Sequence, residues 1–93
     1  MSSAKIARLY RVRGRVQGVG FRYFVEHSAN ALGLAGWVRN LDDASVEVYA
    51  VGTADQLSEL AGSLWKGPRW AEVRGVDETE APLEHVRGFS VRQ

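Results

Sequence analysis

The chain of 93 residues contains no cysteine, one methionine and two prolines. Without cysteine it can form no disulfide, thiolate nucleophile, or cysteine-ligated zinc or iron–sulfur cluster. No stretch approaches the roughly 20 apolar residues of a membrane span, and the first fifteen residues hold no apolar segment of signal-peptide length. These absences exclude several enzyme classes and predict a cytoplasmic protein without a membrane partner.

The remaining composition is that of an ordinary globular domain, with 45% hydrophobic and 25% charged residues. A chain of this length has room for one hydrophobic core. We therefore predict a single domain over residues 1–93, with its core between about residues 7 and 92.

Charge is distributed unevenly along the chain. Residues 1–41 hold seven basic side chains against one acidic, whereas the remainder holds five basic and ten acidic. This asymmetry predicts either an anionic partner near the first half or a surface of mixed sign that favours solubility. Charge alone leaves both interpretations open.

Hydrophobic periodicity in the first half predicts a strand, a helix and a hairpin. A period of two from Tyr10 to Val16 indicates a half-buried strand that ends near Arg15. A helical stripe follows from Phe21, and Gly33 is placed to end it. The stripe comprises Phe21, Phe24, Val25, Ala29 and Leu32. Residues 37–41 and the inward set Val46, Val48 and Ala50 then predict two strands joined by a turn over residues 42–45.

The second half predicts a helix and two further strands. Thr53 and Gln56 have the spacing of a capping box, before Leu57, Leu60, Ala61 and Leu64 at helical intervals. Gly67-Pro68 ends this helix, and residues 70–77 and 88–92 read as strands. The order βαββαβ predicts an α+β protein with the ferredoxin-like α/β sandwich, an antiparallel sheet with two helices on one face. The other face is then free to expose Arg11, Arg13 and Arg15 to water.

The segment GRVQGVGFR, from Gly14 to Arg22, carries the strongest chemical signal. Gly18 and Gly20 stand where a strand must turn into a helix, and glycine allows positive φ and close approach to a ligand. Amide groups of this loop could converge at the helix N-terminus, which favours an anion such as phosphate. Arg22 adds a planar fork of donors that matches phosphate oxygens. The alternative is a tight turn in which Arg22 pairs with a nearby carboxylate.

These motifs together resemble the acylphosphatase family. GRVQGVGFR is followed by a helix, then by GWVRN, a short turn and SVEV. The resemblance runs from about Leu9 to Arg92 and includes Gly67-Pro68 and the ending GFSVR. One departure is Asp43-Ala44 in the hairpin turn, where many members have Asp-Gly. Alanine tolerates positive φ poorly, so a different type of turn can be expected here.

The resemblance implies hydrolysis of acyl phosphates to a carboxylate and inorganic phosphate. It places the phosphate-binding arginine of the family at Arg22 and its water-positioning asparagine at Asn40. The loop amides expected to hold the phosphoryl group are those of Gln17, Gly18, Val19, Gly20, Phe21 and Arg22. Without the resemblance, Asn40 would read as a polar residue capping the hairpin.

The remaining residues bear on whether the protein needs a metal, a cofactor or a partner. His27 and His85 are isolated from spaced carboxylates, so we expect no metal and no cofactor. We also expect a monomer. A non-catalytic module that binds acyl or carbamoyl phosphate is the main alternative to an enzyme. An RNA-binding domain of the same fold would need aromatic strand motifs that the sequence lacks, so no nucleic-acid partner is predicted.

Overall fold

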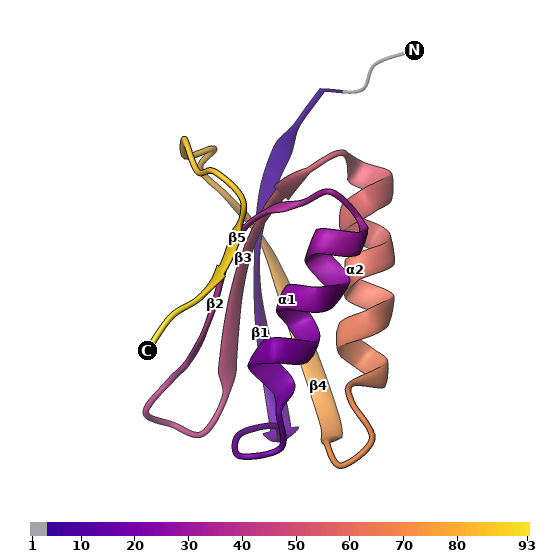
Figure 1. The fold of residues 1–93 in the computed structure, drawn as a ribbon, viewed down its shortest axis with the longest axis vertical. Helices are drawn as coiled ribbons and strands as arrows, with labels where there is room; N and C mark the ends of the chain where they lie inside the picture. The colour runs from indigo at the N-terminus through magenta and orange to yellow at the C-terminus, as the bar shows by residue number, and fades with distance from the viewer. Residues whose placement is uncertain (1–3) are drawn as a thin grey trace.

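Two helices cover one face of a five-stranded sheet in the computed structural model, which describes residues 4–93 (Figure 1). In chain order the elements are β1 (Ile6–Arg15), α1 (Phe21–Ala31), β2 (Ala35–Asn40), β3 (Val46–Gly52), α2 (Ala54–Lys66), β4 (Glu72–Ala81) and β5 (Phe89–Val91). The strands lie in the order β4-β1-β3-β2-β5. This arrangement confirms the predicted ferredoxin-like sandwich. Within residues 4–93, neither helix has the length and apolar character needed to cross a membrane.

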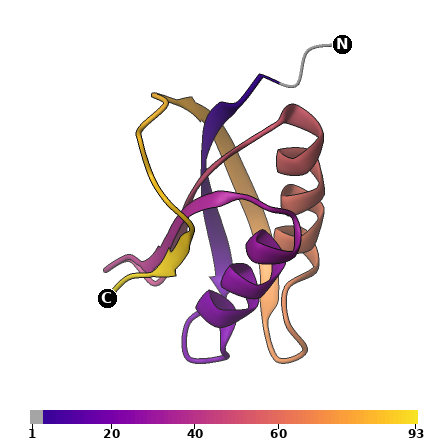
Figure 2. The same ribbon diagram turned by 45° about the horizontal axis from the view of Figure 1, so that its top comes forward.

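The sheet departs from a purely antiparallel arrangement at one edge. β1 pairs antiparallel with β3 and β4, and β2 with β3, but β5 lies parallel to β2, with Gly36 opposite Phe89. β4 and β5 lie at opposite edges of the sheet, and residues 82–88 cross the sheet between them (Figure 2). The parallel pairing brings the C-terminal segment beside β2.

Strands β1 and β4 each extend further at one end than the sequence predicts. β1 begins at Ile6 rather than Tyr10, and β4 runs from Glu72 to Ala81 rather than from 70 to 77. Residues before Tyr10 pair with β3 on one side and with the end of β4 on the other. Residues 6–9 are Ile, Ala, Arg and Leu, which do not alternate between apolar and polar, so the period-two pattern gives little sign of them.

The core lies between the sheet and the helices, where the predicted inward residues meet. Tyr10 is opposite Val48, Val12 is opposite Val46, and all four side chains are fully buried. The Tyr10 hydroxyl donates to the Leu57 carbonyl oxygen at 3.1 Å, which joins β1 to α2. Burial raises the pKa of Tyr10 to about 12. Each such side chain stabilises the fold by roughly 1.5–3 kcal/mol through loss of apolar contact with water.

Helix α2 begins as the sequence predicts. The Thr53 hydroxyl accepts from the Gln56 amide, and the Gln56 side chain accepts from the Thr53 amide, which completes the capping box. The two tryptophans near the end of this helix are more exposed than is usual for this residue type. Trp65 and Trp70 are 53% and 70% exposed, although large aromatic residues are usually at least partly buried.

Ion pairs account for much of the uneven charge distribution. On the sheet face opposite the helices, Arg13 pairs with Asp77 and Arg39 with Glu47, at 2.9 and 2.7 Å. Arg8, which lies on the same face of β1 as Tyr10, pairs with Glu78 at 3.0 Å. Arg11 also pairs with Asp43. The Arg13 guanidinium, which hydrogen-bonds Asp77, lowers the pKa of that carboxyl. Acidic residues from the second half of the chain therefore neutralise most arginines of the first half.

The hairpin between β2 and β3 contains a strained residue. Ala44 has φ of 75°, the left-handed region in which a side chain is disfavoured by about 1–2 kcal/mol. The hydrogen bond from the Ala44 amide to the Leu41 carbonyl, at 3.2 Å, helps to hold this conformation. The turn therefore keeps a geometry suited to glycine although the residue is alanine.

Replacing Ala44 with glycine is expected to raise the free energy of unfolding by about 1 kcal/mol, because strain is removed and only part of that gain is lost to greater chain entropy. For a domain of this size the midpoint of thermal unfolding should rise by about 4–8 °C. Differential scanning calorimetry would measure the change. The exposed Ala54, in the first turn of α2, offers the opposite control, since Ala54→Gly should lower the midpoint.

Candidate active site

The loop between β1 and α1 has the backbone conformation that its glycines predict. Gly18 and Gly20 have φ values of 73° and 77°. A Cβ atom built on either would meet nothing within 4 Å, so the requirement is conformational and not one of space. Within residues 4–93, the amides of residues 17–20 donate no backbone hydrogen bond. They remain available to an anion.

The first turn of α1 adds positive potential to this loop. Gly20 is the N-cap and supplies no side-chain cap, and no acidic residue lies in the first turn. The free amides and the positive end of the helix dipole consequently face the loop without an acidic side chain to balance them. Arg22, in the same turn, increases the positive charge. The charge of this region therefore favours a negatively charged group.

Arg22 is held by the C-terminal segment and not by a carboxylate. Its Nη1 atom donates to the carbonyl oxygen of Arg92 at 2.8 Å. No acidic residue of the described chain forms an ion pair with it. The carbonyl restrains the guanidinium while leaving its charge uncompensated. The tight-turn interpretation, which required a carboxylate partner, does not describe this arrangement.

A small cavity of about 100 Å³ joins this loop to the end of β2. Its lining residues are Val16, Gly18, Gly20, Phe21, Arg22, Tyr23 and Asn40. Most of the predicted site residues are thus brought together, although Asn40 lies on a different element from the loop. Val16 and Tyr23 are lining residues that sequence reasoning missed, and only their positions next to the loop and Arg22 hinted at them.

Asn40 lines this cavity, and the Oδ1 atom of its side chain has no protein partner within residues 4–93. Its Oδ1 atom is buried and accepts no hydrogen bond from the described residues. A buried acceptor without a donor costs about 1–3 kcal/mol, so such groups ordinarily bind a water or ligand. The hairpin turn is instead closed by the backbone bond from the Leu41 amide to the Ser45 carbonyl oxygen and by that from the Ala44 amide to the Leu41 carbonyl oxygen. Asn40 is therefore not the cap of that turn.

Two predicted loop residues do not line the cavity. Val19 packs against the main core. The Gln17 Nε2 atom donates to the carbonyl oxygens of Leu41 and Ser45, both at 2.8 Å. This side chain connects the loop to the hairpin directly after Asn40, so it sets the spacing between the two walls of the cavity.

Replacing Gln17 with alanine is expected to lower the free energy of unfolding by about 1–2 kcal/mol and to weaken phosphate binding, because the loop loses both attachments. The two carbonyls keep their backbone donors from Ala44 and Leu41, which limits the loss. Thermal unfolding and the dissociation constant of inorganic phosphate would measure the two effects. If both were unchanged, the Gln17 bonds would not be what holds the loop.

The described part of the chain holds no group of three or more histidine, aspartate or glutamate side chains suited to a metal ion. The two histidines are exposed on different segments, α1 and the connection before β5. The cavity itself is lined by amides, one guanidinium, one carboxamide and one phenol. Groups of these kinds are suited to bind and orient an anion.

Comparisons with known proteins agree with this geometry. The sequence model of the family described as Acylphosphatase matches residues 8–91. An acylphosphatase of Solibacter usitatus (strain Ellin6076) is 57% identical over 86 residues, covering 92% of this chain and 90% of the relative. The crystal structure of acylphosphatase from Bacillus subtilis superposes with a TM-score of 0.92 at 39% identity, over 95% of this chain and 99% of that one.

The same fold also occurs within a longer protein. The crystal structure of T. kodakarensis HypF matches with a TM-score of 0.81 at 32% identity. The match covers 97% of this chain but only 12% of that protein. A domain of this kind therefore exists both in short chains and as a small part of larger ones.

Proposed function

The chain belongs to the acylphosphatase family and is an enzyme that hydrolyses acyl phosphates, and from that premise we propose that Arg22 and the loop of residues 17–22 bind the phosphoryl group while Asn40 positions the attacking water. The observation that carries this proposal is the cavity that Arg22 and Asn40 both line, together with the unpaired Oδ1 atom of Asn40. One group is suited to an anion and the other to a hydrogen-bond donor such as water.

Phosphoryl binding follows from the charges and donors around the loop. In phosphoryl transfer, charge is spread over the non-bridging oxygens, so preorganised donors can supply most of the catalysis. The free amides of the loop provide such donors, and the Arg22 guanidinium provides two more in one plane. Arg92 supports this arrangement because its carbonyl oxygen restrains the guanidinium before substrate binds.

Positioning of the water is assigned to Asn40 because of its location and its chemistry. The Oδ1 atom can accept a hydrogen bond from water, which would aim the water oxygen at phosphorus opposite the leaving carboxylate. A carboxamide is no general base. As the water–phosphorus bond forms and the phosphorus–acyl oxygen bond breaks, the proton of the water passes to a phosphoryl oxygen of the substrate. The products are a carboxylate and inorganic phosphate.

Substrate-assisted proton transfer is favoured because neither a carboxylate nor an imidazole lines the cavity. Tyr23 is the titratable lining residue besides Arg22, and its side chain is 66% exposed. Tyr23→Phe should therefore retain most of the activity with an unchanged profile of kcat against pH. A limb of that profile that disappeared in Tyr23→Phe would assign the proton to the phenol instead.

The cavity size bears on the range of substrates. A volume of about 100 Å³ suits the phosphoryl group and leaves the acyl group outside. We therefore infer that acyl phosphates with different acyl groups are accepted, and that the phosphoryl group supplies most of the recognition. We further propose that the enzyme acts as a monomer without a metal, cofactor or nucleic acid.

Hydrolysis of benzoyl phosphate by the purified protein in excess EDTA tests the proposal. We expect turnover in EDTA, with competitive inhibition by inorganic phosphate. Turnover that stopped in EDTA and returned with a divalent cation would contradict the metal-free chemistry. If benzoyl phosphate bound in competition with inorganic phosphate but was not hydrolysed, the result would instead support a binding module. The occurrence of this fold inside a longer protein gives a precedent for that alternative.

A further inference from the structure

Three basic side chains of the first half have no acidic partner among the described residues: Lys5, Arg15 and Arg22. Arg22 belongs to the cavity already described. Lys5 lies just before β1, whereas the phosphate loop follows its last residue. Since β1 has ten residues, the two positions are roughly 30 Å apart. Lys5 is consequently a separate uncompensated charge at the opposite end of the sheet.

Residues 82–88, the segment between β4 and β5, lie over the sheet at this end and form a roof that is held in place by hydrogen bonds. The Tyr49 hydroxyl donates to the Pro82 carbonyl oxygen at 2.7 Å and accepts from the Glu84 amide at 2.8 Å. At the other end of the segment, the Gly36 amide donates to the Gly88 carbonyl oxygen at 2.9 Å. Beneath it lies a second hydrophobic cluster built around Ala7, Tyr49 and Val51. The roof is therefore anchored at both ends by hydrogen bonds and covers an apolar floor.

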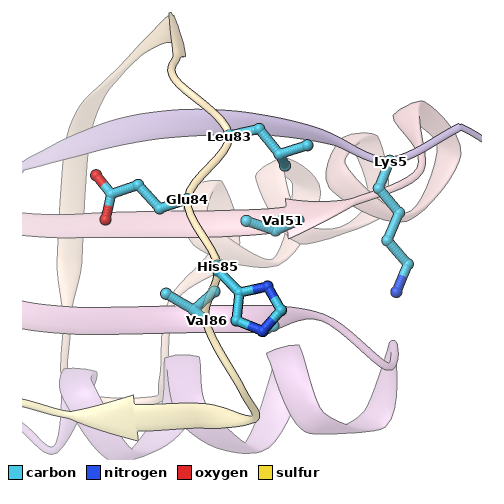
Figure 3. A pocket seen from close by; sticks show the side chains of 7 residues that line it. Lys5, Val51, Leu83, Glu84, His85 and Val86 are labelled. Atoms are coloured by element: carbon cyan, nitrogen blue, oxygen red, sulfur yellow. The ribbon is translucent and has the colours of Figure 1, made fainter.

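A cavity of about 350 Å³ opens beside this roof. It is lined by Lys5, Ala35, Val51, Leu83, Glu84, His85 and Val86. Figure 3 shows Lys5 and His85 reaching the same side of the cavity from two different segments, with the apolar side chains of Val51 and Leu83 above His85 in this view. In the same view the Glu84 carboxylate points to the other side. The cavity therefore combines apolar walls with two hydrogen-bond donors at one side.

Exposed apolar surface at this cavity indicates a ligand with an apolar part. Leu83 is 61% exposed, one of five large hydrophobic side chains identified as exposed among residues 4–93. Its neighbours Val51 and Val86 belong to the second hydrophobic cluster, so an aliphatic chain placed against Leu83 would extend that cluster. The volume falls within the range of small-molecule sites, about 300–1,000 Å³.

We propose that this cavity binds a short aliphatic carboxylate. The aliphatic chain lies against Val51, Leu83 and Val86, and the carboxylate accepts hydrogen bonds from the Lys5 ammonium and the His85 imidazole N–H. An anionic head is selected because Lys5 lacks an acidic partner, and a charge-assisted hydrogen bond is about twice as strong as a neutral one. The site is separate from the phosphate loop, so the two should bind their ligands independently.

The test is a titration of the full chain with sodium hexanoate through the millimolar range, in which the chemical shifts of the backbone amides report binding. For a ligand of this size we expect a dissociation constant of about 1 mM. The shifts should cluster at Ala35, Val51 and Val86 and should persist when inorganic phosphate saturates the loop. 1-Hexanol and hexylammonium should bind at least about tenfold more weakly, because neither presents an anion to Lys5.

Matched variants assign the contacts, since the chain has two lysines and two histidines. Lys5→Gln and His85→Ala should each weaken hexanoate binding about five- to tenfold, whereas Lys66→Gln and His27→Ala should leave it unchanged. All four side chains are exposed, so each variant should fold. The proposal is overturned if the shifts move to residues 17–22, if phosphate displaces hexanoate, if 1-hexanol binds as tightly, or if the variants of Lys5 and Lys66 behave alike.

Discussion

Arg22→Ala is expected to lower kcat/KM for benzoyl phosphate by about a thousandfold or more, because it removes a charged, bidentate donor from the phosphoryl oxygens. The effect on stability should be much smaller. Loss of the bond to the Arg92 carbonyl oxygen costs about 1 kcal/mol, and removal of a cation from the first helical turn returns about 0.3–1 kcal/mol. The two nearly cancel. Steady-state kinetics and thermal unfolding on the same preparation would separate the effects.

Two further variants make the Arg22 prediction specific. Arg22→Lys keeps the positive charge but loses the planar fork, so its kcat/KM should fall between those of the wild type and Arg22→Ala. Arg87→Ala removes an exposed arginine from the segment before β5 and should leave kcat/KM unchanged. Full activity in Arg22→Ala with a lower unfolding midpoint would mean that Arg22 supports the C-terminal segment and does not bind substrate.

Asn40→Ala is expected to lower kcat by about a hundredfold or more while changing KM by less than about threefold, since the side chain orients the attacking water and does not hold the phosphoryl group. Stability should be unchanged or slightly higher. The substitution removes a buried acceptor that has no donor in the protein, and therefore sacrifices no hydrogen bond made by Oδ1. Loss of activity in a protein of undiminished stability would be the signature of this role.

Two controls accompany Asn40→Ala, one that changes the charge of this residue and one that changes an asparagine elsewhere. Asn40→Asp keeps the shape but adds a negative charge beside the phosphoryl group, so KM should also rise. Asn30→Ala changes an exposed asparagine of α1 and should leave both constants unchanged. If Asn40→Ala raised KM and left kcat intact, Asn40 would be a substrate-binding residue and the water would have to be oriented by another group.

Much of the fold could be predicted because its determinants are local. The period-two pattern around Tyr10 and the helical stripe from Phe21 report which side of each element is buried, and both agree with the core. The Thr53 capping box was predicted from the spacing of two residues and is present. In the loop, the positive φ of Gly18 and Gly20 followed from the need to turn sharply between a strand and a helix.

Tertiary structure alone decided which groups meet at the site. Arg22 and Asn40 were identified by resemblance to a family, and their shared cavity depends on how α1 packs against the end of β2. Gln17 was predicted as a source of a backbone donor, but its side chain also connects the loop to the hairpin. The position of Arg92 beside Arg22 depends on the parallel pairing of β5 with β2. No local pattern encodes contacts of this kind.

The sequence by itself determined the elements, their buried faces, the loop conformation and the family, because each depends on neighbouring residues or on a motif read directly from the chain. The tertiary structure decided the pairing of strands across the sheet, the neutralisation of the arginines and the second cavity under residues 82–88. Those features join residues that are far apart in the chain, and the contacts between them stabilise the protein only when the backbone has folded. Side-chain periodicity reports burial of one element and carries no information about which distant partner covers it.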